Sequence, residues 1–228
     1  MCRYAVVGAI FLLAGSAWAQ SPSGATAPSP TSADAAKPVL AMEEPLPGDF
    51  WTYEVRDEIS GKVTATRTNV VTEVSSSEIS VRYNIAGKET DGLNVYDRSW
   101  NLKSSAPWKY RPHEGSGITS PLKVGANWSF AGDNVNGDNG NIWKQTGQSK
   151  VVGQETITTK AGTFDTFKIE TVASRHPTKD PTRKVEITQQ TWYAPAIDHW
   201  VKRILVTRAD KHLVVNNTIE LIEYGRKK

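Results

Sequence analysis

The chain of 228 residues is poor in cysteine, in long apolar runs and in net charge. Its single cysteine, Cys2, cannot form an internal disulfide and cannot supply a multi-thiolate metal site. After the first residues no segment approaches the roughly eighteen apolar residues that a transmembrane helix requires. With 27 Lys and Arg against 24 Asp and Glu, the formal net charge is +3, so composition offers no general attraction to nucleic acid.

The N-terminus has the pattern of a secretory signal peptide over residues 1–19. A basic residue, Arg3, precedes an apolar run over residues 5–14, and Ala17-Trp18-Ala19 forms a small-residue cleavage site. Cleavage after Ala19 would remove Cys2 with the signal, and no cysteine stands at the cleavage point to carry a lipid. The sequence therefore predicts a periplasmic or secreted protein with no transmembrane segment after cleavage.

A segment rich in Ala, Pro, Ser and Thr follows over residues 20–44. It contains no aromatic residue, so it buries too little apolar surface to offset the entropy of ordering it. We expect a disordered linker here. The remaining residues, 45–228, are long enough for one folded domain.

Alternation of apolar and polar residues dominates residues 45–228. Trp51, Tyr53 and Val55 alternate with polar residues, and the segment from Ile79 to Ile85 follows the same period of two. This period is typical of antiparallel strands with one buried face. No segment shows sustained helical spacing. We predict an all-β fold: a single antiparallel domain of about ten strands, forming a curved sheet, a half-barrel or a barrel.

One phrase occurs twice, at Gly48–Tyr53 and at Gly125–Phe130, and both copies read G-x-x-W-x-[Y/F]. Each copy opens a strand-like stretch, which suggests two tandem β halves at about 45–103 and 121–224. The two tryptophans should occupy comparable, largely buried positions. Near the C-terminus the apolar face changes parity around Leu221, which predicts a bulge or bend in the last strand.

Motifs for catalysis, metal binding or cofactor binding are missing from the sequence. His113, His176, His199 and His212 are isolated in expected turns, and none has the i, i+4 partner of a zinc helix. The loop over residues 133–141 resembles a calcium loop but lacks its glycine and its final glutamate. We therefore assign no catalytic residue, no metal ligand and no cofactor from the sequence.

Two expected loops have the composition of binding segments. The first, over residues 105–120, joins the two halves and contains the candidate binding residues Trp108, Tyr110, Arg111 and His113, because aromatic residues and arginine concentrate interface energy. The second, over residues 175–184, carries four fixed positive charges and would suit an anionic head group or polymer. A solvated hairpin end is the simpler interpretation of the second loop.

Residues of the second half resemble a known bacterial group. The strand Lys160–Glu170 contains A-G-T-F-D-T-F-K-I, residues 192–195 read W-Y-A-P, and Val201-Lys202-Arg203 follow. Mainly over residues 120–224, the chain resembles exported bacterial domains of the domain of unknown function 3108-like group, some described as TapB-like. The turn at residues 196–199 departs from that group, whose members tend to have glycines there. The resemblance implies an all-β, barrel-like envelope domain and supplies no catalytic residues.

Three hypotheses for function remain open at this level. The first is a non-enzymatic binding or scaffold module whose partner is an envelope protein, polymer or lipid. The second is a carrier of a hydrophobic ligand such as a lipid or a lipoprotein acyl chain, which requires an open apolar cavity. The third is a carbohydrate-active enzyme with a carboxylate pair, because such pairs are assembled in space and leave no sequence motif.

The signal and linker interpretations predict the N-terminus of the mature protein. We expect N-terminal sequencing of the exported protein to start at Gln20, and limited proteolysis to cut first before about residue 44, since this segment has no apolar periodicity to dock it. A different first residue would contradict the cleavage site, and an undigested segment would contradict the linker.

Overall fold

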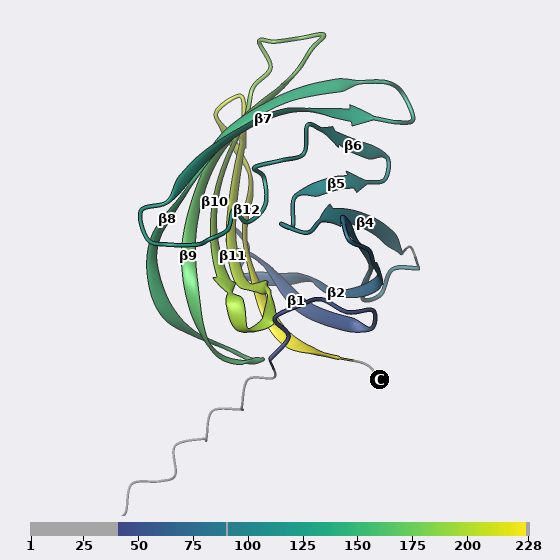
Figure 1. Ribbon diagram of the computed structural model, residues 1–228. Coiled ribbons are helices and arrows are strands. Elements are labelled where there is room, and N and C mark those ends of the chain that lie inside the picture. The colour runs from purple at the N-terminus through teal and green to yellow at the C-terminus, as the bar shows by residue number, and fades with distance from the viewer. Residues whose placement is uncertain (1–40, 90, 227–228) are drawn as a thin grey trace, which may run out of the picture. The chain divides into compact units, whose positions relative to one another are not determined.

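The computed structural model describes residues 41–89 and 91–226, and these form one closed antiparallel barrel (Figure 1). The strands of the first half are β1 (Asp49–Asp57), β2 (Lys62–Val74), β3 (Glu78–Ile85), β4 (Gly92–Asp97), β5 (Leu102–Ser105) and β6 (Trp108–Arg111). Those of the second half are β7 (Asn127–Asn136), β8 (Ile142–Thr159), β9 (Gly162–Pro177), β10 (Val185–Ala194), β11 (His199–Ala209) and β12 (His212–Arg226). A single 3₁₀ turn, η1 (Pro195–Ile197), separates β10 from β11 within the described residues.

Each strand pairs with its neighbours along the chain, and β1 pairs with β12 to close the barrel. The all-β, antiparallel prediction is therefore confirmed. The twelve strands exceed the expected ten because residues 92–103 contain a turn between β4 and β5, and because residues 108–111 form an additional strand. Closure gives every strand a partner on both sides, although residues 127–132 of β7, 152–159 of β8 and 162–166 of β9 extend beyond a shorter neighbour.

The repeated phrase adopts the same local geometry in both halves. Gly48 and Gly125 have φ of 93° and 89°, a region that suits glycine. The backbone N–H of Gly48 donates to the carbonyl of Val71 on β2, and that of Gly125 donates to the carbonyl of Val151 on β8, each at 2.8 Å. The two copies thus open β1 and β7, the first and seventh strands of one continuous sheet.

The predicted bulge in the last strand is confirmed. Thr52 lies opposite Glu223, but the next residue, Tyr53, lies opposite Leu221, so Ile222 is the extra residue on β12. A bulge of this kind increases local twist and curvature, which helps a sheet to close.

A bidentate ion pair connects the first strand to the last. Arg226 Nε and Nη2 donate to the two carboxylate oxygens of Asp49 at 2.6 and 3.0 Å. Asp49 is fully buried and also accepts the N–H of Leu46. Hydrogen bonding to Asp49 raises the pKa of Arg226. This pair therefore stabilises the closure of the barrel beside the β1–β12 ladder.

The expected signal peptide, and the linker up to residue 40, lie outside the described residues. The linker boundary at residue 44 needs correction, because Met42 is 1% exposed and packs in the main core. Its N–H donates to the carbonyl of Ala196 at 2.8 Å. The packed structure therefore includes residues before Pro45, since an apolar side chain in the core belongs to the fold.

Trp51 and Trp128 differ in burial although their local geometry matches. Trp51 is 0% exposed, whereas Trp128 is half-buried, and its indole N–H donates to the carbonyl of Gly115 at 2.8 Å. The expectation of deep burial thus holds for the first repeat only. The reason is that Trp51 lies under other aromatic rings, whereas Trp128 packs at the border of a smaller cluster.

This difference predicts unequal stability losses. We expect Trp51→Ala to lower the free energy of unfolding by about 3–5 kcal/mol, the usual cost of emptying a packed aromatic site. Trp128→Ala should cost about 1–3 kcal/mol because part of its ring is already in solvent. Urea denaturation of both variants measures the two losses. Equal losses would contradict the assignment of Trp51 to the core and Trp128 to its border.

Candidate functional site

The interior of the barrel contains three neighbouring cavities, and Tyr96, Trp100 and Arg203 line all of them. Their volumes are about 300, 240 and 50 Å³. The largest is lined by aromatic, aliphatic and polar residues from seven strands and from the β4–β5 turn: Trp51, Tyr53, Val55, Arg67, Asn69, Val81, Asn94, Tyr96, Trp100, Leu102, Ser105, His199, Trp200, Arg203 and Ile219. The described residues thus enclose a lined space, and Arg203 lies where the three cavities meet.

Arg203 is a half-buried cation without an acidic partner among the described residues. Its guanidinium carbon lies 4.3 Å from the ring centroid of Trp200. Its Nε is buried and has no hydrogen-bond acceptor, and among the described residues no carboxylate comes within ion-pair distance of the side chain. Burial lowers the pKa of Arg203. An unpaired charge away from bulk water is costly, so the fold maintains a net attraction for an anion here.

Arg67 brings a second positive charge to the same cavity. Its Nε donates to Asn69 Oδ1 at 2.9 Å, and its guanidinium carbon lies 3.8 Å from the ring centroid of Tyr83. Within the described residues no carboxylate forms an ion pair with it. Each of the two arginines lowers the pKa of Tyr53, against the larger rise that burial causes. The cavity is therefore electropositive.

Aromatic rings build the wall beside Arg203. Tyr53 stacks on Trp200 at 3.9 Å between centroids, and its hydroxyl donates to the Trp200 carbonyl at 2.9 Å. Trp51 and Trp100 meet edge to face at 5.9 Å, and both contact the ring of His199. Trp51 and Tyr53 are buried, and their packing limits the rotamers of the half-buried Trp100 and Trp200, which present a preformed surface to the cavity.

Trp100 reaches the cavity from an unusual backbone conformation. It lies in the turn between β4 and β5 with φ of 58°, which is left-handed and costs a tryptophan about 1–3 kcal/mol. Its indole N–H donates to Asp198 Oδ2 at 3.1 Å, and Asp198 also accepts a hydrogen bond from Tyr193. Burial raises the pKa of Asp198. These contacts compensate for the strain and hold the indole against the cavity.

The predicted binding residues separate into two sets. Tyr110 and His113 line the cavity of about 240 Å³ that also contacts Arg203. Trp108 is half-buried and lines none of the three cavities, and Arg111 is exposed. The loop assignment for this region was wrong, because residues 108–111 form β6, which pairs with β5 and β7.

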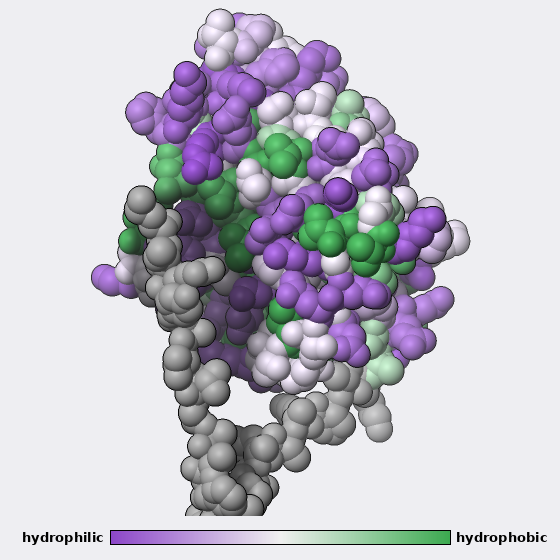
Figure 2. All heavy atoms as spheres, turned by 90° about the vertical axis from the view of Figure 1, so that its left-hand side faces the viewer, coloured by the Kyte–Doolittle hydropathy of each residue, from purple (hydrophilic) through white to green (hydrophobic). Residues whose placement is uncertain are grey.

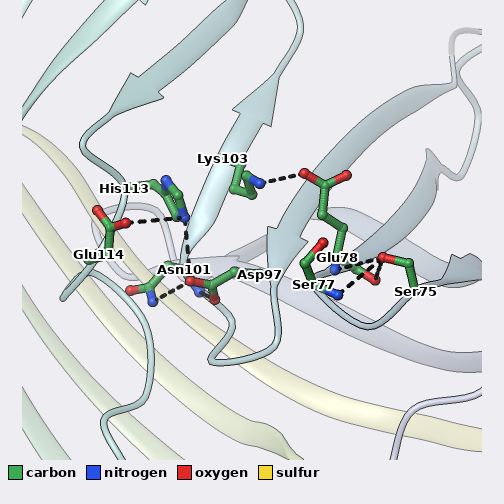
Figure 3. A network of polar contacts seen from close by, with 8 residues as sticks. All are labelled: Ser75, Ser77, Glu78, Asp97, Asn101, Lys103, His113 and Glu114. Carbon is green, nitrogen blue, oxygen red and sulfur yellow. Dashed lines mark hydrogen bonds and ion pairs between the residues drawn. The ribbon is translucent and has the colours of Figure 1, made fainter.

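His113 fixes the start of the connection that follows β6 (Figure 3). Its Nε2 lies 3.5 Å from Asp97 Oδ2 at the end of β4 and 3.8 Å from Glu114 Oε1. Further along, the N–H of Gly117 donates to Asn101 Oδ1 at 2.6 Å. The connection over residues 112–126 is thus attached to the β4–β5 turn. It covers the interior where β7 extends beyond its four residue pairs with β6.

A larger groove, of about 730 Å³, lies along the ends of β8 and β9 next to η1. Several of its polar groups are already paired: Trp192 Nε1 donates to Glu155 Oε1 at 2.5 Å, and Thr156 donates to Asp165 at 2.8 Å. It lacks an unpaired buried charge among the described residues, so the interior cavities are the better candidate site. The described residues also contain no cluster of three or more acidic, histidine or cysteine side chains arranged for a metal ion.

The sequence analysis did not identify Arg67, Tyr53, Tyr96 or Arg203 as binding residues. One signal was available: Arg203 interrupts the strand run Trp200–Val206 instead of lying in a turn, and arginine is rare in the middle of a buried strand face. Its partners carried no such signal, because aromatic residues that alternate along strands indicate packing as readily as binding.

Fold and site together define a closed antiparallel β-barrel with an internal electropositive cavity. The model of the DUF3108-like family matches residues 132–203, which confirms the resemblance noted in the sequence, and the match ends at Arg203. No curated protein is significantly similar to the chain in sequence.

Two solved structures share the fold. A "putative lipoprotein" from Parabacteroides distasonis has a TM-score of 0.53 and 15% identity, covering 82% of this chain and 100% of that one. A "putative exported protein with YmcC-like fold" from Bacteroides fragilis has a TM-score of 0.52 and 17% identity, again covering 82% and 100%. At these identities the similarity concerns the barrel and not the residues inside it. No helix in the described part of the chain is long and apolar enough to cross a membrane.

Burial of His199 predicts a pH dependence of stability. Burial, reinforced by Arg203, lowers the pKa of His199 well below its ordinary value of 6.5. Below about pH 6.5 His199 is protonated in the unfolded chain but stays neutral in the folded chain. The free energy of unfolding should therefore fall with falling pH, by up to about 1.4 kcal/mol per pH unit.

Burial raises the pKa of Asp198, so protonation of Asp198 at low pH favours the folded state and opposes the effect of His199. Comparing wild type with His199→Phe separates the two, because Asp198 is present in both proteins. Urea denaturation between pH 7 and pH 5 should show a smaller loss for His199→Phe, whereas His212→Phe, at an exposed site, should follow wild type. Parallel profiles for wild type and His199→Phe would contradict a neutral buried imidazole.

Proposed function

We propose that the protein is an exported binding protein that holds a small anionic molecule with an aromatic or apolar body inside its barrel. The observation that carries the proposal is Arg203, half-buried at the junction of three cavities without an acidic partner among the described residues. An arginine without an acidic partner lowers the stability of the fold unless a ligand neutralises its charge. Residues that lower stability in this way are common in binding sites.

The charge of the site supports an oxyanion as the polar group of the ligand. A guanidinium presents a planar fork of N–H donors that matches a carboxylate or a phosphate. Arg67 faces the same cavity and adds to the field. Glu114 is the one acidic residue among those that line the three cavities, and it lines only the cavity of about 240 Å³.

The walls and the size of the site indicate a ligand with a small aromatic or apolar body. The half-buried rings of Tyr96, Trp100 and Trp200 offer faces and edges on which a planar or apolar body packs well. A volume of about 300 Å³ lies at the lower end of ligand pockets, so a small molecule fits better than a lipid with several chains. The proposal therefore combines a binding module with a carrier of a partly hydrophobic molecule.

The proposal that the protein is exported rests on the N-terminal signal pattern. The two structural neighbours are described as a lipoprotein and an exported protein, which agrees with export. In the periplasm or outside the cell, such a protein would hold or pass on a molecule that belongs to the envelope. A non-enzymatic role agrees with a cavity whose conspicuous groups are arginines and aromatic rings.

A pair of matched probes tests the role of Arg203. We expect isothermal titration to show that 2-naphthoate binds at least tenfold more tightly than the neutral 2-naphthalenemethanol. A hydrogen bond to a charged group contributes about 1.5–3 kcal/mol, which corresponds to roughly tenfold to 150-fold. In Arg203→Met the preference should disappear, and the midpoint of thermal unfolding without ligand should be equal or higher, since an unpaired charge has been removed.

Arg208→Met is the matched control, because Arg208 lies on the same strand and is exposed. It should retain the preference for naphthoate. Equal binding of the two probes by wild type, or a preference that survives in Arg203→Met, would refute the assignment of Arg203 as the anion-binding group.

A further inference from the structure

Trp143 of β8 lies close to two arginines. The guanidinium carbons of Arg175 on β9 and of Arg183 in the β9–β10 connection each lie 5.7 Å from its ring centroid. The two arginines come from the basic segment 175–184 that the sequence analysis noted. Figure 2 shows that hydrophilic residues cover most of the end of the barrel at which this connection lies.

Within the described residues neither arginine forms a direct ion pair, although the charge of Arg183 helps to lower the pKa of Asp180 in the same turn. Lys144 and Lys184, which lie nearby along the chain, pair with Asp133 and Glu186. In contrast, no carboxylate in the described part of the chain forms an ion pair with Arg175 or Arg183. Arg175 Nε is in addition buried without an acceptor. This orphaned donor distinguishes the cluster from a solvated hairpin end, where water satisfies every charged group.

The position of Arg175 connects the cluster to the barrel interior. Arg175 lies opposite Gln145 in the β8–β9 ladder, and Gln145 lines the same cavity as Tyr110. Burial raises the pKa of Tyr110, and the positive charge of Arg175 opposes that rise. Tyr110 lines the cavity of about 240 Å³ that extends to Arg203. The cluster therefore lies at the edge of the internal space and not on a remote part of the surface.

We propose that Trp143, Arg175 and Arg183 form a second anion-binding site, which takes an oxyanion group, carboxylate or phosphate, between the two guanidinium groups. A cation–π contact with an indole does not use the N–H groups of a guanidinium as hydrogen-bond donors, so they remain available to an anion. Two such groups on one ring offer several charge-assisted hydrogen bonds to one oxyanion. The proposal does not depend on whether Arg203 binds the anion of an internal ligand.

The test follows the indole N–H signal of Trp143 by ¹⁵N NMR of the whole protein, with Trp143→Phe to assign the signal. Inorganic phosphate and acetate are titrated at constant ionic strength with chloride as the reference ion. We expect a saturable shift with phosphate, acetate or both, and the stronger of the two identifies the oxyanion. Shifts no larger than those with chloride would overturn the proposal.

Arg183→Gln is the main variant because Arg183 is exposed and its replacement leaves the core intact. It should weaken the saturable binding at least tenfold, as should Arg175→Gln, whereas Arg208→Gln should change it less than twofold. An unchanged affinity in Arg183→Gln would also overturn the site. Arg203→Met should leave the phosphate or acetate shift intact, so failure of the internal site and failure of this one give different results.

Discussion

The unpaired charge of Arg203 inside a closed barrel is the constraint on which the interpretation of this structure depends. A barrel of twelve strands has space for side chains and for a cavity, and apolar side chains alone would fill that space at lower cost. Here the interior contains a guanidinium that rests on Trp200 and meets no carboxylate of the described residues. The aromatic wall, the strained turn at Trp100 and the attached connection after β6 all surround that group.

Closure of the sheet makes the internal charge possible. Because β1 pairs with β12 and each intermediate strand pairs with its neighbours, the backbone satisfies its own hydrogen bonds and leaves the interior to side chains. The buried Asp49 and its bidentate contacts to Arg226 strengthen the seam. Arg226 and Arg203 show two opposite uses of arginine in one fold: the first is paired and stabilises the barrel, and the second is unpaired and available.

Positive charge is also distributed along the interior. Arg67 shares the largest cavity with Arg203. Arg175 lies opposite Gln145, which lines the cavity of about 240 Å³, and both Arg175 and Arg183 lie near the ring of Trp143. Each of these arginines contacts an aromatic ring, which supplies some stabilisation without neutralising the charge. An anion that approaches or occupies the barrel therefore meets guanidinium groups at more than one depth.

Local sequence determined the class of fold, because a period of two and a change of parity are properties of neighbouring residues. The alternation at Trp51–Val55 predicted antiparallel strands, and the parity change near Leu221 predicted the bulge on β12. The strand β6 was missed because its four residues lie between Pro107 and Pro112, and only pairing with β5 and β7 makes them a strand.

The candidate site was decided by tertiary structure alone. Tyr53, Arg67, Tyr96 and Arg203 lie up to 150 residues apart in the sequence and meet only because β1 closes onto β12. Of the predicted binding residues, Tyr110 and His113 contribute to the internal cavities, whereas Trp108 and Arg111 do not, because side-chain direction depends on the register of a strand that local pattern did not reveal. The sequence by itself determined alternation, length and the export pattern. The burial and isolation of a charge depend on which distant strands pair, and only the closed barrel settled that.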